Sequence, residues 1–206
     1  MKGVRIMPCE ASRRRRRQRL HDYTAAMFPA PIKHCKACGA PVVYRVPADD
    51  NRDRATCTGC GHVHYENPLN VVGTVPVWGD EVLLCRRNIE PRYGLWTLPA
   101  GFLELGETTA EGALRETVEE AGARIELDGL YTVLNVVRVG QVHLFYRARL
   151  LDTAFAPGPE TIEAQLFSEA SIPWEQLAFR TVRETLQCFF ADRRSGRFGL
   201  HCVDVG

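Results

Sequence analysis

Glu116, Glu119 and Glu120 lie close together in residues 109–121, a segment composed mostly of good helix formers. Residues three and four positions apart share one face of a helix, so the sequence predicts three neighbouring carboxylates there. Such like charges repel one another unless a cation lies between them, and carboxylate oxygens are ligands that Mg²⁺ prefers. We therefore predict a metal site on this helix, with a solvated acidic helix face as the alternative.

The residues on either side of these glutamates extend the pattern. Residues 101–123, GFLELGETTAEGALRETVEEAGA, resemble the Nudix box, in which glycine, glutamate and arginine recur at fixed spacings. Two apolar positions of the box hold smaller residues, Thr117 and Ala123. The fixed positions are all filled, by Gly101, Glu107, Arg115, Glu116, Glu119, Glu120 and Gly122. The resemblance implies a Nudix hydrolase, which cleaves a nucleoside diphosphate linked to another group.

The resemblance also implies a fold and a set of roles. The fold is an α/β/α sandwich with a mixed sheet, and the box forms a loop, a helix and a second loop. The three helical glutamates would bind Mg²⁺ or Mn²⁺ or activate water. Arg115 and Glu107 would order the loop through an ion pair, and the carbonyl of Ala100 would be a further metal ligand. No Ser–His–Asp or Cys–His set is evident, so direct attack by water on a metal-neutralised diphosphate is expected.

A second set of candidate ligands precedes the box. Two C-x-x-C pairs, each followed by glycine, stand at a separation typical of four-thiolate zinc sites. Four thiolates give a closed, structural Zn²⁺ site, so we predict a zinc ribbon. Two disulfides or a redox pair are the alternatives, and an intracellular enzyme disfavours disulfides. His62 and His64 are predicted to lie outside the ligand set, since four sulfurs suffice. The predicted ligands are Cys35, Cys38, Cys57 and Cys60.

Composition and charge indicate how the chain is organised. With 206 residues, 45% hydrophobic residues and a net charge of +1, the sequence suits one main domain plus a small appendage, and a nucleic-acid partner is not expected. No apolar run reaches the length of a membrane span, and a cytoplasmic enzyme is expected. We predict a disordered basic tail over 1–32, the zinc ribbon over 33–66, the Nudix domain over 67–200 and a C-terminal tail over 201–206.

The predicted N-terminal tail carries the basic run Arg13–Arg17 before any apolar periodicity begins. The segment has too little to bury to offset the entropy of ordering, so we predict disorder. A nucleic-acid arm and an organelle-targeting peptide are the alternatives.

The remaining elements are predicted from hydrophobic periodicity and turn residues. Pro76, inside the first predicted strand, indicates an edge or a bulge. Strands are predicted at 70–78, 81–86, 130–139, 141–151 and 164–168, and helices at 172–179 and 181–194.

Three further segments bear on the substrate: residues 86–107, 155–167 and 172–179. Their sequences, RRNIEPRYGLWTLPAGFLELGE, FAPGPETIEAQLF and IPWEQLAF, resemble the zinc-ribbon Nudix group that includes plant chloroplast FAD diphosphatase. The resemblance implies a dinucleotide substrate, FAD cleaved to FMN and AMP, with NADH or ADP-ribose as alternatives. The SQPWPFPxS segment that NADH pyrophosphatases carry after the box is absent. A homodimer is also expected.

Candidate substrate contacts flank the box. Trp96 and Phe102, with Tyr93, have flat rings that gain from stacking on a base, although burial in the core is the alternative for each of the first two. Arg86 and Arg87 are bidentate donors suited to phosphate, although exposed strand-edge arginines are equally common.

A glutamate outside the box is expected as a further metal ligand or base, because Nudix enzymes often use one. The APGPE loop and its neighbours supply Glu160 and Glu163, and we prefer Glu163 because it lies just before a predicted strand. Exposed loop charge is the alternative for both.

A function of another class is a nucleotide-sensing regulator that binds nucleic acid through the ribbon and the basic tail. The intact glutamates of the box favour an enzyme, because a pure sensor can lose them.

Overall fold

The structure, a computed structural model, describes residues 30–206 of the chain. The basic run Arg13–Arg17, on which the prediction of a disordered tail depends, lies outside the described residues. The chain divides into two compact units, Met1–Asn67 and Pro68–Gly206. Within the part that is described, no helix is long and apolar enough to cross a membrane.

The first unit is built on a small antiparallel sheet. Its strands β1 (Val42–Arg45), β2 (Arg54–Cys57) and β3 (Val63–His64) pair in that order. The buried apolar residues of its described part are Cys35, Ala55 and Cys57. An apolar core this small cannot stabilise a sheet, so the unit needs another source of folding free energy.

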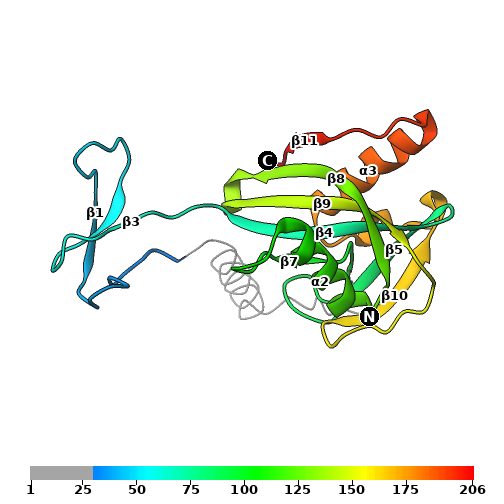
Figure 1. The fold of residues 1–206 in the computed structure, drawn as a ribbon, viewed down its shortest axis with the longest axis horizontal. Coiled ribbons are helices and arrows are strands. Elements are labelled where there is room, and N and C mark those ends of the chain that lie inside the picture. Colours follow the sequence, from blue (N-terminus) through cyan, green and yellow to red (C-terminus); the bar gives the residue numbers. More distant parts are fainter. Residues whose placement is uncertain (1–29) are drawn as a thin grey trace, which may run out of the picture. The chain divides into compact units, whose positions relative to one another are not determined.

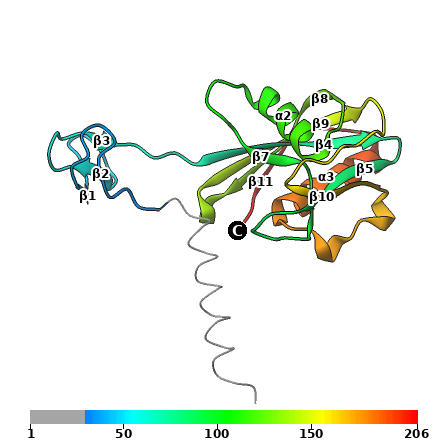
Figure 2. The ribbon, with the colours of Figure 1, turned by 90° about the horizontal axis from the view of Figure 1, so that it is seen from below.

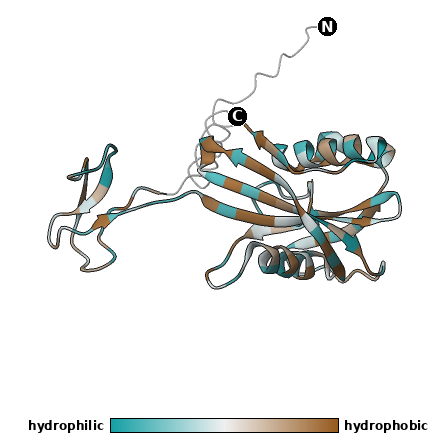
Figure 3. Ribbon diagram, turned by 45° about the horizontal axis from the view of Figure 1, so that its top comes forward, coloured by the Kyte–Doolittle hydropathy of each residue, from teal (hydrophilic) through white to brown (hydrophobic). Residues whose placement is uncertain are grey.

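The second unit is a mixed sheet with α2 on one face and α3 on the other (Figures 1 and 3). The strand order is β10-β5-β4-β9-β8-β11, with β6 paired to β5 and β7 paired to β4. The pairs β4–β9 and β8–β11 are parallel and the others antiparallel. The predicted mixed sheet between helices is therefore confirmed. The bounds are β4 (Leu69–Trp78), β5 (Glu81–Arg87), β6 (Trp96–Thr97), β7 (Ala100–Phe102), α2 (Thr109–Ala121), β8 (Ile125–Val136), β9 (Gln141–Leu150), β10 (Thr161–Phe167), α3 (Arg180–Ser195) and β11 (His201–Asp204).

The main core lies between the sheet and α3, and Figure 2 shows the same two layers from another side. Val182, Leu186, Phe189 and Phe190 recur at helical spacing on α3 and are almost completely buried. A smaller cluster lies under α2 and includes Leu83, Cys85, Ala121, Ala123 and Leu150. The helix that carries the acidic residues is thus fixed on the sheet by its own apolar face.

The long strand β4 changes neighbours along its length. Its first half pairs with β7 and its last residues pair with β5, while β9 follows its other side throughout. The amide of Thr74 donates to the carbonyl of Pro99 over 3.1 Å, on the side of β7 and β5. Backbone nitrogens two residues apart in a strand point to the same side, so the nitrogen of Pro76 points to the same side as the amide of Thr74. It lies between the segment of β4 that pairs with β7 and the segment that pairs with β5, where no amide hydrogen is needed. The predicted irregularity at Pro76 is this local interruption of the ladder.

Residues 172–179 were predicted to form a helix, and this prediction is wrong. The region contains one short 3₁₀ turn, Trp174–Gln176, and another, Glu169–Ser171, precedes it. Pro173 lies between them and has no amide hydrogen to continue a helix. The chain then extends to β6, where the amide of Ala178 donates to the carbonyl of Trp96 over 2.8 Å.

The predicted C-terminal tail and one strand boundary also need correction. Residues 201–206 contain β11, which pairs in parallel with β8, and Val205 beyond it is buried. The strand predicted at 130–139 runs over Ile125–Val136 and is followed by a 3₁₀ turn at Val137–Val139. Both errors involve segments whose structure depends on distant partners rather than on local pattern.

Candidate active site and zinc site

The sequence of α2 specifies both of its ends. The hydroxyl of Thr108 accepts the amide of Glu111, and the Glu111 carboxylate accepts the amide of Thr108, which completes a capping box. Gly122 ends the helix in the left-handed conformation, with φ of 59°. Thr117, at a position where the box usually has a larger apolar residue, is buried and donates to the carbonyl of Ala113 over 2.8 Å. Both ends of the helix are therefore fixed, and with them the positions of its glutamates along the sheet.

Gly101 lets α2 approach β7 closely. A Cβ atom at this position would lie 2.4 Å from the carboxylate of Glu116, well inside van der Waals contact. The first glycine of the box is therefore required by the position of the first helical glutamate.

We predict that Gly101→Ala lowers kcat about a hundredfold, because a displacement of about 1 Å at a reacting group has an effect of that size. Steady-state hydrolysis measured beside a thermal midpoint checks this. The control is Gly199→Ala, since a Cβ atom there meets no atom within 4 Å. An active Gly101→Ala variant with an unchanged midpoint contradicts the argument.

Arg115 holds the loop of the box against the helix. Its Nη2 and Nε donate to the two oxygens of Glu107 over 2.7 and 3.0 Å. Its Nη1 donates to Glu116 over 2.6 Å and to Glu119 over 3.1 Å, and Nη2 reaches the carbonyl of Phe102 over 3.1 Å. The guanidinium lowers the pKa of Glu107 to about 2. The ion pair implied by the resemblance is present, and it links the loop to two of the three helical glutamates.

Glu116 and Glu120 are carboxylates held out of water beside one another. Burial and the charge of Glu116 together raise the pKa of Glu120 to about 7, although the amide of Ala100, which donates to Glu120 over 3.0 Å, opposes the rise. Burial likewise raises the pKa of Glu116. Glu119 is more accessible, with 58% of its side chain exposed. Two desolvated like charges with hard oxygen atoms are what a divalent cation would stabilise, so the residues fit Mg²⁺ or Mn²⁺.

The raised pKa of Glu120 predicts a pH dependence of stability. A carboxyl group with a folded pKa near 7 and an ordinary value of 4.5 favours folding when it is protonated. This contribution is fully present below pH 4.5 and is lost as the pH rises through 7. In Mg²⁺-free buffer we expect the free energy of unfolding to lose about 3 kcal/mol over that range through this group. Urea unfolding at several pH values tests it, and Glu120→Gln should remove the part of the dependence that comes from this group, while Glu116, whose pKa is also raised, keeps its own part.

The glutamate outside the box that faces this cluster is Glu160. Its charge contributes to the raised pKa of both Glu116 and Glu120. Glu163 instead accepts from Nη1 of Arg86 over 3.0 Å. These contacts support Glu160, the residue ranked second in the sequence analysis, and the choice between it and Glu163 stays a prediction.

Main-chain contacts hold the loop before Glu160 against the end of α2. The amide of Ala156 donates to the carbonyl of Ala121 over 3.0 Å, and the amide of Gly158 donates to that of Glu120 over 3.3 Å. A Cβ atom on Gly158 would lie 2.0 Å from the carbonyl oxygen of Glu119, so only glycine fits there.

The predicted substrate contacts fall into two groups. Arg87 is almost fully buried, lies 5.1 Å from the ring of Phe179 and is held by the carbonyl of Pro91, and its charge acts on Glu120. Phe179 was not singled out from the sequence, because nothing local marks it. Phe102 is 54% exposed beside the box and can meet a ligand.

The structure places Trp96 in the core, which is the alternative given for it in the sequence analysis. Only 7% of its surface is exposed, and its ring packs edge-to-face on Phe167 with 4.8 Å between centroids. Arg86 is occupied by Glu163 and by the carbonyl of Gly94. Among the four predicted substrate contacts, Arg87 is the one whose charge changes the pKa of an acidic residue of the cluster, Glu120.

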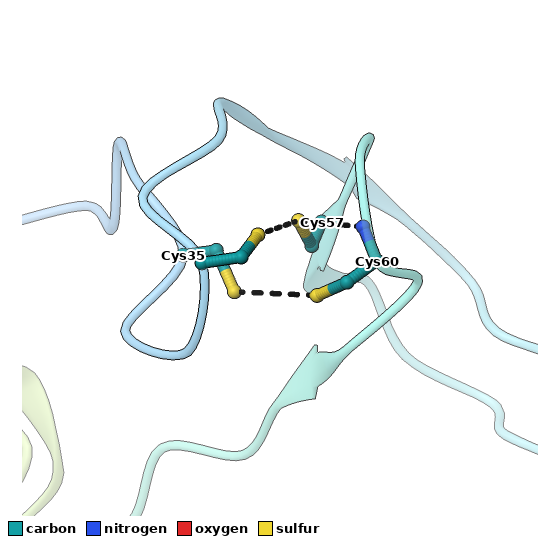
Figure 4. A group of neighbouring side chains, drawn as sticks. Cys35, Cys57 and Cys60 are labelled. Carbon is teal, nitrogen blue, oxygen red and sulfur yellow. Dashed lines mark hydrogen bonds between the residues drawn. The ribbon is translucent and has the colours of Figure 1, made fainter.

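The four predicted zinc ligands converge in the first unit (Figure 4). Their sulfur atoms all lie within 4.8 Å of one another, with 3.4 Å between Cys38 and Cys57 and 3.8 Å between Cys35 and Cys60. Tetrahedral zinc with bonds of about 2.3 Å places sulfurs about 3.8 Å apart. All four are free thiols, so the cluster fits zinc better than the disulfide alternative.

Backbone amides support the thiolate form in this cluster. The amide of Cys60 donates to the sulfur of Cys57 over 3.3 Å, as does that of Gly59, and these bonds lower the pKa of Cys57 to about 6. His62 and His64 contact each other edge-to-face and are not members of the sulfur cluster. The donor set is thus four sulfurs, as the sequence predicts.

Comparison with known proteins agrees with this geometry. A family model described as the NUDIX domain matches residues 68–187, and one described as Nudix N-terminal, a zinc ribbon, matches residues 33–66. The chain belongs to the Nudix family. This Nudix hydrolase is similar to the crystal structure of a NUDIX hydrolase from Nitrosomonas europaea, with a TM-score of 0.80 and 44% identity, covering 84% of this chain and 100% of that one.

Two relatives of this Nudix hydrolase carry more specific names. The NAD-capped RNA hydrolase NudC of Pseudomonas aeruginosa strain LESB58 is 29% identical over 167 residues, which are 80% of this chain and 57% of that protein. An ADP-ribose pyrophosphatase from Streptococcus suis has a TM-score of 0.55 and 26% identity, covering 66% of this chain and 99% of that one. The chain therefore spans little more than half the length of NudC.

Proposed function

We propose that this Nudix hydrolase cleaves the diphosphate bond of a dinucleotide in a reaction that depends on a divalent metal, with FAD, cleaved to FMN and AMP, as its first substrate. The observation that carries the proposal is the buried carboxylate of Glu120 close to the partly buried carboxylate of Glu116, where the charge of each, with that of Glu160, disfavours ionisation of its neighbour. Such an arrangement is unfavourable alone and favourable around a cation.

The residues divide into ligands and positioning groups. Glu116, Glu119 and Glu120, with the carbonyl of Ala100, would hold Mg²⁺ or Mn²⁺, and the ion would neutralise the diphosphate and make water more acidic. Arg115 and Glu107 fix the loop that carries these ligands. Glu160 faces the same space and is our candidate for the group that takes the proton of the attacking water.

Arg87 supplies a second positive charge beside the acidic residues, in addition to Arg115, which already binds Glu116 and Glu119. The guanidinium of Arg87 is desolvated and acts on Glu120 and Glu160, so it is placed to meet an anionic phosphate beside the acidic residues. A bidentate guanidinium suits a phosphate better than an ammonium group does. We infer that Arg87, rather than Arg86, contacts the diphosphate.

The choice among dinucleotides rests on resemblance. The zinc ribbon and the segments around the box resemble the FAD diphosphatase group, whereas NudC and the ADP-ribose pyrophosphatase indicate NAD-type and ADP-ribose substrates as alternatives. In each case the bond attacked is a diphosphate between a nucleoside and a second group. The predicted homodimer stays a prediction.

One assay series tests the proposal. The full chain is incubated with FAD, NADH or ADP-ribose, with Mg²⁺ or Mn²⁺, and the products are separated by chromatography. We expect FMN and AMP from FAD, with the highest kcat/KM of the three. Faster cleavage of NADH or ADP-ribose would assign the enzyme to an alternative substrate, and no cleavage of any substrate with either metal would refute the proposal.

A further inference from the structure

A row of three side chains crosses the sheet on the face opposite the acidic helix α2, at the strand that contacts the acidic residues. Val71 of β4 lies opposite Phe102 of β7 on one side and opposite His143 of β9 on the other. Paired residues on neighbouring strands point to the same face of a sheet. Strands lie about 4.8 Å apart, so Phe102 and His143 flank Val71 about 10 Å from each other. Leu69 and Gln141 form the next pair on the same face, and we call these five residues the ring patch.

Within residues 30–206, neither α2 nor α3 covers the ring patch. Phe145, two residues after His143 on the same face, belongs to the core under α3. Figures 1 and 3 show α3 over the other end of the sheet, away from the end where β4 begins. Phe102 and Leu69 are 54% and 46% exposed, so the patch is apolar and accessible.

His143 contributes an unused hydrogen-bond acceptor to this patch. Burial lowers its pKa to about 4, so the imidazole is neutral near pH 7. Its Nε2 lies 2.9 Å from the amide oxygen of Gln141, which can only accept, so Nε2 carries the proton. Nδ1 is then an acceptor, and it is buried with no hydrogen-bond partner among the described residues. An N–H donor from a bound molecule would relieve this unfavourable state.

The ring patch adjoins the hydrolytic residues through β7. Phe102 follows Gly101, whose α-carbon lies against the carboxylate of Glu116, and its carbonyl accepts from Arg115 over 3.1 Å. Two residues earlier, the amide of Ala100 binds Glu120. The acidic residues and the ring patch lie on opposite faces of the sheet, so a molecule with its diphosphate at the acidic residues reaches the patch by crossing the edge of β7.

We propose that the ring patch binds the heterocycle of the nucleotide substrate, which lies over Val71, stacks on Phe102 and donates an N–H group to Nδ1 of His143. The inference rests on the proposed function for the position of the diphosphate. The required chemistry, a flat ring with an N–H donor, occurs in the amino group of adenine and in the imide of flavin. AMP and FMN distinguish these two sources.

The test measures binding directly in the full chain by isothermal titration with AMP, FMN and ribose 5-phosphate, which has no ring system. We expect Phe102→Ala and His143→Ala to weaken the binding of AMP, FMN or both about tenfold, and to leave ribose 5-phosphate unchanged. Trp78→Ala is the matched control, because Trp78 is a 42% exposed aromatic residue at the other end of β4. Phe102 is exposed enough for its variant to fold if His143→Ala does not.

The outcomes separate this inference from the proposed function. Unchanged affinity for AMP and FMN in Phe102→Ala overturns the ring patch even if dinucleotides are hydrolysed. Failure of the wild-type chain to bind either nucleotide also overturns it, as does a change in sedimentation of Phe102→Ala without a change in affinity, which would assign the patch to a second copy. Weakened nucleotide binding without any dinucleotide hydrolysis supports the patch and refutes the proposed reaction.

Discussion

Replacing Glu120 with glutamine is expected to lower kcat/KM for the dinucleotide by about a thousandfold or more, with the fold retained. The change keeps the shape of the side chain and removes its charge from the most buried position of the acidic cluster. A lost metal ligand removes several kcal/mol of transition-state stabilisation, and about 1.4 kcal/mol corresponds to a factor of ten. Steady-state kinetics with saturating Mg²⁺ measure the loss, and circular dichroism monitors the fold.

The matched control for this variant is Glu111→Gln on the same helix. Glu111 accepts the amide of Thr108 at the start of α2, away from the acidic cluster, and glutamine can fill the same role in a capping box. Glu111→Gln should therefore retain its activity. Near-normal turnover in Glu120→Gln would show that the metal site has been assigned to the wrong residues.

Cys57→Ser is expected to abolish zinc binding and unfold the first unit. Cys57 is buried, receives two backbone amides and lies 3.4 Å from the sulfur of Cys38. Because this unit has almost no apolar core, the metal supplies most of its folding free energy, about 10–16 kcal/mol for structural zinc in small peptides. We expect about one zinc per chain in the wild type and none in the variant, measured by elemental analysis.

Two comparisons make this prediction specific. Cys202→Ser changes an exposed cysteine in β11 and should leave the zinc content unchanged. The Cys57→Ser variant should still hydrolyse its substrate, because none of the four zinc ligands belongs to the acidic cluster. Wild-type protein that contains disulfides and no zinc when purified under reducing conditions would contradict the assignment.

The parts of the site that could be predicted from the sequence are those set by local spacing. The bounds of α2 were predicted at 109–121 and are the same in the structure. Thr108 caps the start of the helix through its side chain, and Gly122 ends it in the left-handed conformation. The pairing of Glu107 with Arg115 followed from the resemblance to the box. The convergence of the four cysteines likewise followed from two short motifs.

The parts that were missed depend on contacts between distant segments. Glu160 and Glu163 are separated by two residues, and only the pairing of β10 with β5 directs Glu163 to Arg86. The burial of Trp96 depends on Phe167, about 70 residues away in the sequence, on which its ring packs. β11 is short and has no turn signal, and it becomes a strand only because β8 offers an open edge.

The main-chain contacts between the 156–158 loop and the end of α2 have an evolutionary consequence. Hydrogen bonds from Ala156 and Gly158 to carbonyls of the helix depend on the backbone, so most side-chain substitutions in the surrounding sheet leave the relative positions of Glu120 and Glu160 unchanged. The side chains of the ring patch are under no such constraint. A lineage could therefore replace Phe102 or His143 and acquire a new substrate while inheriting an intact hydrolytic centre, which makes drift in specificity easier than drift in reaction type.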